Sequence, residues 1–284
     1  MRGGRVLLLL GPVLWIVGLN LAPLFEMTRI SLLDSYPAAP GHVARYGFES
    51  YLTFISSPIY RGSFLRSFVF AAVTTVLALI VAYPLAYAIA LKTPARGRLR
   101  HLLLLVAPFW TSEIVRIFAI MLLLSNRGAV NGVLRWAGIT DDPLPLLYNQ
   151  YSLTFGMLYV VLLAMLLPLY AALEKLPRDL LEAAASLGAK PWTRLVRVTL
   201  PLSRDGVASG SALVFLISLG AFAVPMLLGG ADTTLFSMTI ASMFASSAGR
   251  WPLGAAFGLI LLAGGLGVAG VVMHLTVPRK AAAA

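Results

Sequence analysis

The chain has 284 residues, of which 59% are hydrophobic and only 12% are charged, and its mean hydropathy is +0.88. A soluble domain carries roughly 25% charged residues, so this composition indicates an integral membrane protein. The absence of cysteine excludes disulfide frameworks, thiolate nucleophiles and cysteine-bound metals, and three widely spaced histidines argue against a histidine metal cluster.

Runs of about 20 mostly apolar residues are long enough to cross a bilayer as helices. Six such runs predict six transmembrane helices: residues 6–25, 67–91, 102–126, 143–173, 206–231 and 251–278. A seventh apolar stretch, residues 233–249, is short and rich in Ser and Thr, and we interpret it as an outward-side segment that does not span. We divide the chain into a first helix with an outer segment (1–62), a transmembrane domain (63–278) and a cytoplasmic tail (279–284).

Basic residues are distributed unevenly between the two sides that these helices define. With the N-terminus inside, the inner segments hold 14 basic and four acidic residues, whereas the rest of the chain holds eight basic and seven acidic residues. Nearly all of the formal net charge of +11 therefore lies on one face, which is typical of the cytoplasmic side of a membrane protein. The excess of basic residues therefore reflects membrane topology and does not indicate a nucleic-acid partner. Six spans place both termini in the cytoplasm.

The largest inner segment, residues 174–205, carries a distinctive helical pattern. Pro177 marks the start of a helix, and Gly188 marks the turn at its end. The alanines at 183–185 leave one face flat enough for another surface to approach closely. From the residues alone, this helix either anchors the loop at the membrane interface or forms a docking surface.

The same loop resembles the signature of bacterial ABC importer permeases, in which E-A-A, three residues, Gly, nine residues, an aliphatic residue, one residue and L-P follow one another. The spacing matches throughout, and the only departure is Val at the position where Ile is usual. The matching residues are Glu182, Ala183, Ala184, Gly188, Val198, Leu200 and Pro201. The resemblance implies an all-α integral membrane protein with the type I ABC importer permease fold and neither catalytic residues nor a cofactor.

The resemblance also implies partners. Residues 182–188 would be a coupling helix that docks on a separate ABC ATPase subunit, and the chain has no G-x-x-x-x-G-K-[ST] phosphate loop of its own. A second permease subunit would complete the translocation path in the bacterial inner membrane. The outer segments 31–61 and 126–151 would meet an extracytoplasmic solute-binding protein.

Three further stretches, residues 107–134, 143–176 and 219–230, resemble the spermidine/putrescine permease subfamily, and the first of its two permeases in particular. This implies a polyamine solute, whereas relatives within the subfamily carry opines, aminobutyrate-like compounds and aminophosphonates. The chain departs from the subfamily at Ala221 and within 240–244, where polyamine permeases often carry acids. That departure favours a zwitterion or a monocation unless the partner permease supplies the acids.

Candidate residues for the solute path lie in two of the predicted helices. Glu113 and Arg116 share a helical face, and at membrane depth they form either a mutual ion pair or a solute contact. Trp110 either offers an aromatic face to an ammonium group or belongs to the interfacial aromatic belt. Phe222, Ala223 and Pro225 are candidates for a gate or a lining surface, with a packing kink as the alternative, because Pro225 breaks the fifth helix. Asp232, just after that helix, is a further candidate because a dication needs carboxylates along its path.

Two other functional classes are alternatives. An ATP-independent secondary transporter would show inverted repeats and paired intramembrane charges, and the two halves of this chain show no repeat. A membrane-embedded enzyme would need paired acids, a Ser/His set or metal ligands, and the pattern of residues supports none of these.

Overall fold

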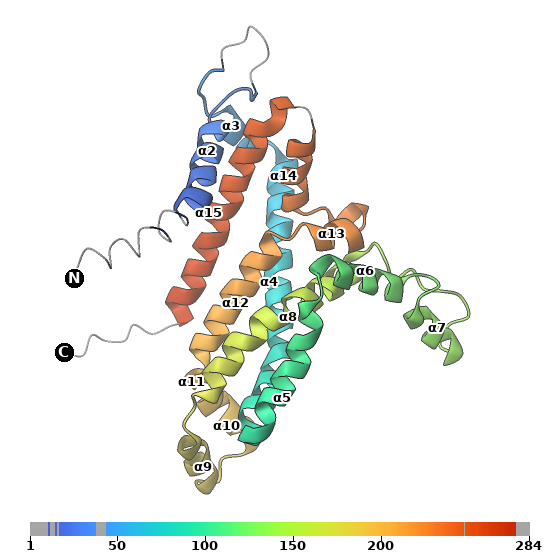
Figure 1. Ribbon diagram of the computed structural model, residues 1–284, viewed down its shortest axis with the longest axis vertical. Helices are drawn as coiled ribbons and strands as arrows, with labels where there is room; N and C mark the ends of the chain where they lie inside the picture. The colour runs from blue at the N-terminus through green and yellow to red at the C-terminus, as the bar shows by residue number, and fades with distance from the viewer. Residues whose placement is uncertain (1–10, 12–14, 16, 38–43, 247, 277–284) are drawn as a thin grey trace, which may run out of the picture. The chain divides into compact units, whose positions relative to one another are not determined.

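The computed structural model describes residues 11, 15, 17–37, 44–246 and 248–276. The described residues are helical apart from turns, extended connections and an isolated antiparallel bridge between Leu33 and Tyr46, so the all-α prediction is confirmed (Figure 1). The chain divides into two compact units, Met1–Leu65 with Phe236–Gly264 and Arg66–Leu235 with Gly265–Ala284. The division falls within two long helices, α4 (Pro58–Tyr87) and α15 (Trp251–Thr276).

Several stretches are apolar and long enough to cross a membrane. The described residues contain four of them: Pro58–Lys92, Glu113–Trp136, Gln150–Glu174 and Trp251–His274. A bent pair of helices, Pro191–Leu202 and Arg204–Leu219, makes a fifth if it is counted as one span. The second, fourth and sixth predicted spans thus correspond to helices of membrane length, whereas much of the first, residues 6–25, lies outside the described residues. The part of it that is described forms the π-helical turn η1 (Val17–Leu21) and the start of α2 (Ala22–Ser31).

The third predicted span, residues 102–126, is not one helix. In its place lie α5 (Ala95–Val106), the 3-10 helix η3 (Ala107–Trp110) and α6 (Glu113–Leu124). The backbone is extended at Thr111 and Ser112. Pro108 has no amide hydrogen, and the Thr111 hydroxyl donates to the Pro108 carbonyl, so local bonding replaces the helical ladder here. The sequence reads as one span because apolar runs, residues 102–110 and 117–124, lie on both sides of the break and together reach membrane length.

The fifth predicted span is broken, as Pro225 indicated. α12 (Arg204–Leu219) stops three residues before α13 (Ala223–Leu228), and Pro225 lies buried inside α13. The chain continues through η5 (Ala231–Thr233) to α14 (Phe236–Ala245). Because α14 has only 10 residues and a span needs about 20, its length agrees with a non-spanning segment.

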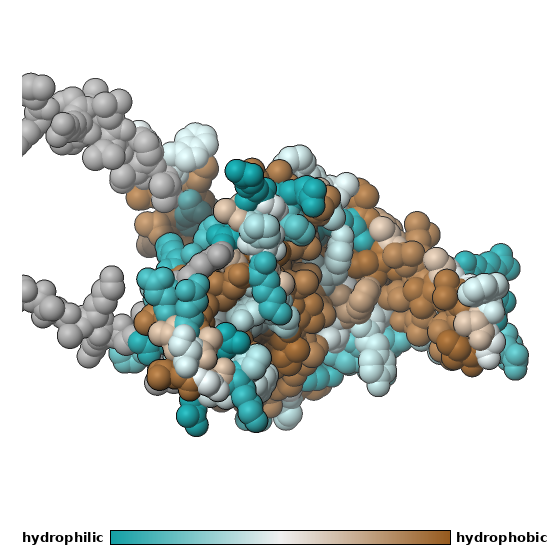
Figure 2. Space-filling view, turned by 90° about the horizontal axis from the view of Figure 1, so that it is seen from below, coloured by the Kyte–Doolittle hydropathy of each residue, from teal (hydrophilic) through white to brown (hydrophobic). Residues whose placement is uncertain are grey.

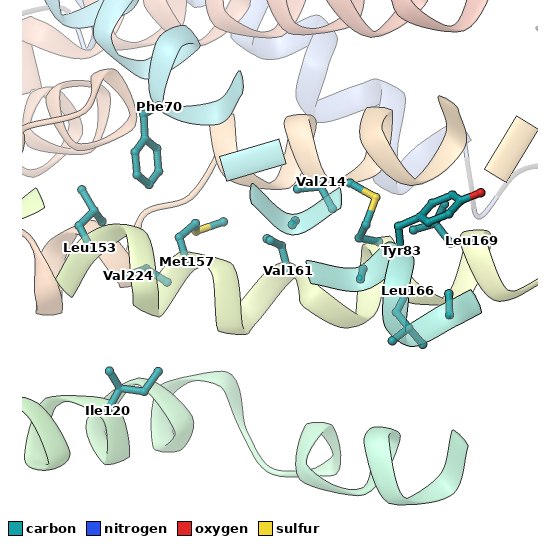
Figure 3. Close-up of a cluster of buried hydrophobic side chains, with 14 of the residues drawn as sticks. Phe70, Tyr83, Ile120, Leu153, Met157, Val161, Leu166, Leu169, Val214 and Val224 are labelled. Carbon is teal, nitrogen blue, oxygen red and sulfur yellow. The ribbon is translucent and has the colours of Figure 1, made fainter. Parts of the chain in front are cut away.

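The core of the second unit is built around α8 (Gln150–Glu174), which packs along α12. A Cβ atom added at Gly206 would lie 2.5 Å from Ala172 Cβ and 2.7 Å from the Pro168 carbonyl oxygen, so only glycine permits this approach. Side chains from α4, α6, α12 and α13 converge on α8 in an apolar cluster. Figure 3 labels Phe70, Tyr83, Ile120, Leu153, Met157, Val161, Leu166, Leu169, Val214 and Val224.

The first unit is held together by aromatic rings. Phe54, on α3 (Glu49–Ser56), has its ring centroid 5.4 Å from that of Phe64, 5.8 Å from that of Phe236 and 5.6 Å from that of Phe257. All three contacts are edge-to-face, and such pairs contribute about 0.5–1.5 kcal/mol each beyond the area they bury. They join α3, α14 and the first turns of α4 and α15.

Asn131, on α7 (Ala129–Trp136), anchors the connection that leads to α8. Its side chain is fully buried; the amide nitrogen donates to the carbonyls of Ser125 at 3.1 Å and Leu144 at 3.0 Å, and the amide oxygen accepts from the Leu144 N–H at 2.8 Å. We expect Asn131→Ala to lower the free energy of unfolding by about 1–3 kcal/mol, because buried backbone groups lose their partners. Thermal melting in detergent measures this. Asn126→Ala, at an exposed position, is the control, and equal melting temperatures for the two variants would contradict the prediction.

Candidate coupling loop and solute path

The candidate coupling loop, residues 174–205 between α8 and α12, forms a short protruding helix at one end of the second unit (Figure 1). This helix, α9 (Arg178–Ser186), begins after the predicted proline and ends at Gly188, whose φ is +79°. The Gly188 N–H donates to the Ala185 carbonyl at 2.9 Å, and the Ala189 N–H donates to the Ala184 carbonyl at 3.1 Å. This pair of bonds is a Schellman motif, which turns the chain out of the helix.

The surface of α9 is left open by the rest of the chain. None of its described side chains is buried: Glu182 and Ala183 are exposed and Ala184 is half-buried. Leu180, in the first turn of α9, and Leu187, just after its last residue, are 47% and 88% exposed. Figure 2 looks onto the end that carries α9 and shows apolar and hydrophilic side chains intermixed. Exposed apolar residues gathered at one tip are typical of a surface that another protein covers.

The return arm of the loop is fixed to the transmembrane helices. It consists of α10 (Pro191–Arg194), the π-helical turn η4 (Leu195–Thr199) and α11 (Leu200–Leu202). The helix axis then bends by 70° into α12 at Ser203, whose hydroxyl forms a buried hydrogen bond of 2.9 Å with the Tyr83 hydroxyl of α4. The arm is therefore joined to α4 by a buried hydrogen bond and to α12 by the chain itself.

The residues that match the signature lie on both arms of the loop. Glu182, Ala183 and Ala184 lie on α9, whereas Val198, Leu200 and Pro201 lie on the return arm, and η4 packs against α9. Val198 is half-buried, and Leu200 and Pro201 are exposed. The fold brings the two arms together without clustering all of these residues at one point.

Glu113 and Arg116 do not form the mutual ion pair, which is one of the two alternatives that their spacing allows. Glu113 is the first residue of α6 and is exposed, where the positive end of the helix dipole favours an acid. Arg116 turns instead toward two aromatic rings, its guanidinium carbon lying 4.7 Å from the Phe109 centroid and 6.0 Å from the Tyr159 centroid. The two rings stack with their centroids 5.8 Å apart. Among the described residues, the buried Nε and Nη1 atoms of Arg116 have no hydrogen-bond partner and no carboxylate at ion-pair distance.

Phe109 and Tyr159 join the candidate path residues, and sequence reasoning missed both of them. Phe109 lies on η3 and Tyr159 on α8, and both side chains are half-buried. An isolated aromatic residue within an apolar run is typical of a packed core, so neither residue carries a signal of its own. Only their meeting across two helices, with Arg116 against them, distinguishes them.

The other path candidates lie near this cluster or on the surface. Phe222 is 44% exposed and precedes α13, which packs against both α6 and α8. The end of α13 is anchored by the Ser152 hydroxyl, which donates to the Leu228 carbonyl at 2.7 Å. Trp110 and Asp232 are exposed, Trp110 by 82%. Arg116 lies on α6, and Phe222 leads directly into α13, the helix that packs against α6.

Comparison with known proteins identifies the family. Residues 102–280 match the family described as binding-protein-dependent transport system inner membrane component. The chain is 36% identical over 209 residues to the spermidine/putrescine transport system permease protein PotB of Escherichia coli K12, which covers 74% of this chain and 75% of that protein. It is 34% identical over 246 residues to PotB of Haemophilus influenzae, which covers 85% of this chain and 83% of that protein.

A solved structure shares the fold. The bacterial alginate ABC transporter in complex with alginate pentasaccharide-bound periplasmic protein contains a chain that matches with a TM-score of 0.69 and 19% identity, over 95% of this chain and 93% of that one. The resemblance read from the coupling loop is therefore confirmed at the level of family and fold. The chain belongs to the inner membrane components of binding-protein-dependent transport systems and is a multi-pass permease of the bacterial inner membrane.

Proposed function

We propose that this chain is one of two permease subunits of an ABC importer for polyamines such as spermidine and putrescine. The observation that carries the proposal is the similarity to two spermidine/putrescine permeases over about three quarters or more of the chain. In this function the chain has six transmembrane helices with both termini in the cytoplasm, and a solute-binding protein delivers the polyamine to its outer side.

We further propose that α9 is the helix through which a separate ATPase drives transport. Its protruding position, its small alanine face and its exposed Leu180 and Leu187 support this role. Glu182 would meet a basic group of the ATPase. Closure of the ATPases on ATP binding would move α9, and the return arm would transmit this movement through the bond between Ser203 and Tyr83.

The aromatic cluster of Phe109 and Tyr159 is the part of the path best suited to an ammonium group. In this structure the guanidinium of Arg116 occupies the two rings, and an alkylammonium that displaced it would gain the same cation–π attraction. A dication also needs carboxylates along its path. We expect Glu113 and Asp232 to contribute, and the acids absent at Ala221 and within 240–244 to come from the second permease.

The proposal can be tested by complementation of cells from which the gene for this chain has been deleted. The wild-type chain, returned on a plasmid, should restore uptake of radiolabelled spermidine or putrescine, and uptake should stop when the cognate ATPase is deleted. Restored uptake of an opine, an aminobutyrate-like compound or an aminophosphonate, without polyamine uptake, would support the importer but show that its solute is not a polyamine. Uptake that persists without the ATPase would favour a secondary transporter.

A further inference from the structure

A cavity of about 510 Å³ lies where the end of α4 meets the return arm of the coupling loop. It is bounded by the last turns of α4, by the π-helical turn η2 (Ala88–Lys92) and by α10, all within the second unit. The side chains on its wall are mainly aromatic, apolar and cationic. They include Tyr83, Tyr87, Lys92, Trp192, Arg194 and Leu195.

The charged groups on this wall are both positive. Lys92 Nζ lies 5.9 Å from the Tyr87 ring centroid, and Arg194 Nε is buried without a hydrogen-bond partner among the described residues. None of the residues lining the cavity is acidic. A buried guanidinium donor without an acceptor is unfavourable, and an anion bound in the cavity would relieve that cost through a charge-assisted hydrogen bond.

The rest of the wall is apolar, and its position is that of a membrane interface. Pro84, Ala88 and Leu195 contribute apolar surface, and Trp192, 73% exposed, lies at the cavity as interfacial aromatic residues do. The cavity lies at the end of the membrane-length helix Pro58–Lys92. Its ligand must therefore combine a negative charge with hydrocarbon.

We infer that this cavity binds an anionic phospholipid, with the headgroup phosphate between Lys92 and Arg194 and an acyl chain along Pro84 and Leu195. Basic pockets between transmembrane helices recognise anionic headgroups in this way. An acidic peptide or a nucleic acid would match the charge but not the apolar wall. The bound lipid would hold α10, and with it the coupling loop, against the end of α4.

Native mass spectrometry of the full-length protein in neutral detergent tests the inference with phosphatidylglycerol and phosphatidylcholine as probes. The wild type should retain one phosphatidylglycerol in preference to phosphatidylcholine. Lys92→Gln and Arg194→Gln should each weaken retention about fivefold, as the loss of one cation near a headgroup does. Arg197→Gln is the matched control, because Arg197 is an exposed cation of the same arm that does not line the cavity.

Three outcomes would overturn the inference. Equal retention of the two lipids would exclude headgroup recognition, equal weakening by Arg197→Gln would indicate diffuse attraction, and displacement of the lipid by inorganic phosphate would identify a free anion as the ligand. If the Gln variants fold poorly, fluorescence quenching in the wild type and in Trp192→Phe tests lipid binding at the cavity instead. Brominated phosphatidylglycerol should quench a component of the wild-type tryptophan fluorescence that Trp192→Phe lacks, and an identical degree of quenching in both would contradict the site. None of these measurements depends on the transported solute.

Discussion

Gly188→Pro is expected to reduce solute uptake by more than about tenfold while leaving the protein in the membrane. Gly188 has a φ of +79°, whereas proline is locked near −65°, so the left-handed turn after α9 cannot form. Proline also removes the N–H that donates to the Ala185 carbonyl, and the Schellman motif is lost. A docking penalty of only ~1.4 kcal/mol already weakens association tenfold. Uptake assays and co-purification with the ATPase subunit measure the effect.

The chain contains a matched control for the backbone strain. Gly138 has a φ of +68° and closes α7 with the same bonds, from its own N–H to the Arg135 carbonyl and from the Ile139 N–H to the Leu134 carbonyl, both 3.0 Å long. Gly138→Pro should therefore impose similar strain yet leave co-purification with the ATPase intact.

Glu182→Lys tests whether the charge of α9 matters for coupling, apart from its helical structure. Glutamate and lysine have similar helix propensities, so α9 should persist while the charge on its exposed face is reversed. Uptake should again be lost. Normal uptake by both Glu182→Lys and Gly188→Pro, or equal loss of the ATPase from Gly138→Pro and Gly188→Pro, would exclude α9 as the coupling element.

Gly206→Leu is expected to destabilise the second unit by about 3 kcal/mol or more. The Cβ atom alone would lie 2.5 Å from Ala172 Cβ and 2.7 Å from the Pro168 carbonyl oxygen, and a backbone atom cannot rotate away as a flexible side chain can. α12 would have to separate from α8, and the core around α8 would open. Thermal melting in detergent and the yield of monodisperse protein report this loss.

Gly62→Leu, the same change of residue, is expected not to lower the stability of the protein. Gly62 also lies within a helix, α4, but no atom lies within 4 Å of a Cβ built there. Leucine favours a helix over glycine by up to about 1 kcal/mol, so this variant should melt at or above the wild-type temperature. Similar melting temperatures for Gly62→Leu and Gly206→Leu would show that close packing of α12 on α8 does not limit stability.

Much of the coupling loop was predictable because its structure depends on neighbours in sequence. Pro177 and Gly188 bound α9 as predicted, since a proline at a helix start and a left-handed glycine at its end act within one turn of the chain. The break in the fifth span near Pro225 was predictable for the same reason, because proline and glycine act on the backbone beside them. Composition and the distribution of charge indicated a membrane protein, and the spacing of the loop motif indicated the family.

The contacts of the candidate path residues were not predictable to the same degree, because they are made between helices. The break at Thr111 and Ser112 lies between two apolar runs that together read as one span, and it places Glu113 at an exposed helix start. Arg116 could not be assigned to Phe109 and Tyr159 from spacing, since these residues come from separate helices. Sequence alone determined the membrane class, the family and the local caps, because these follow from composition and short-range bonding. Tertiary structure alone decided which charges and rings meet, because that depends on the angle and register at which η3, α6 and α8 pack.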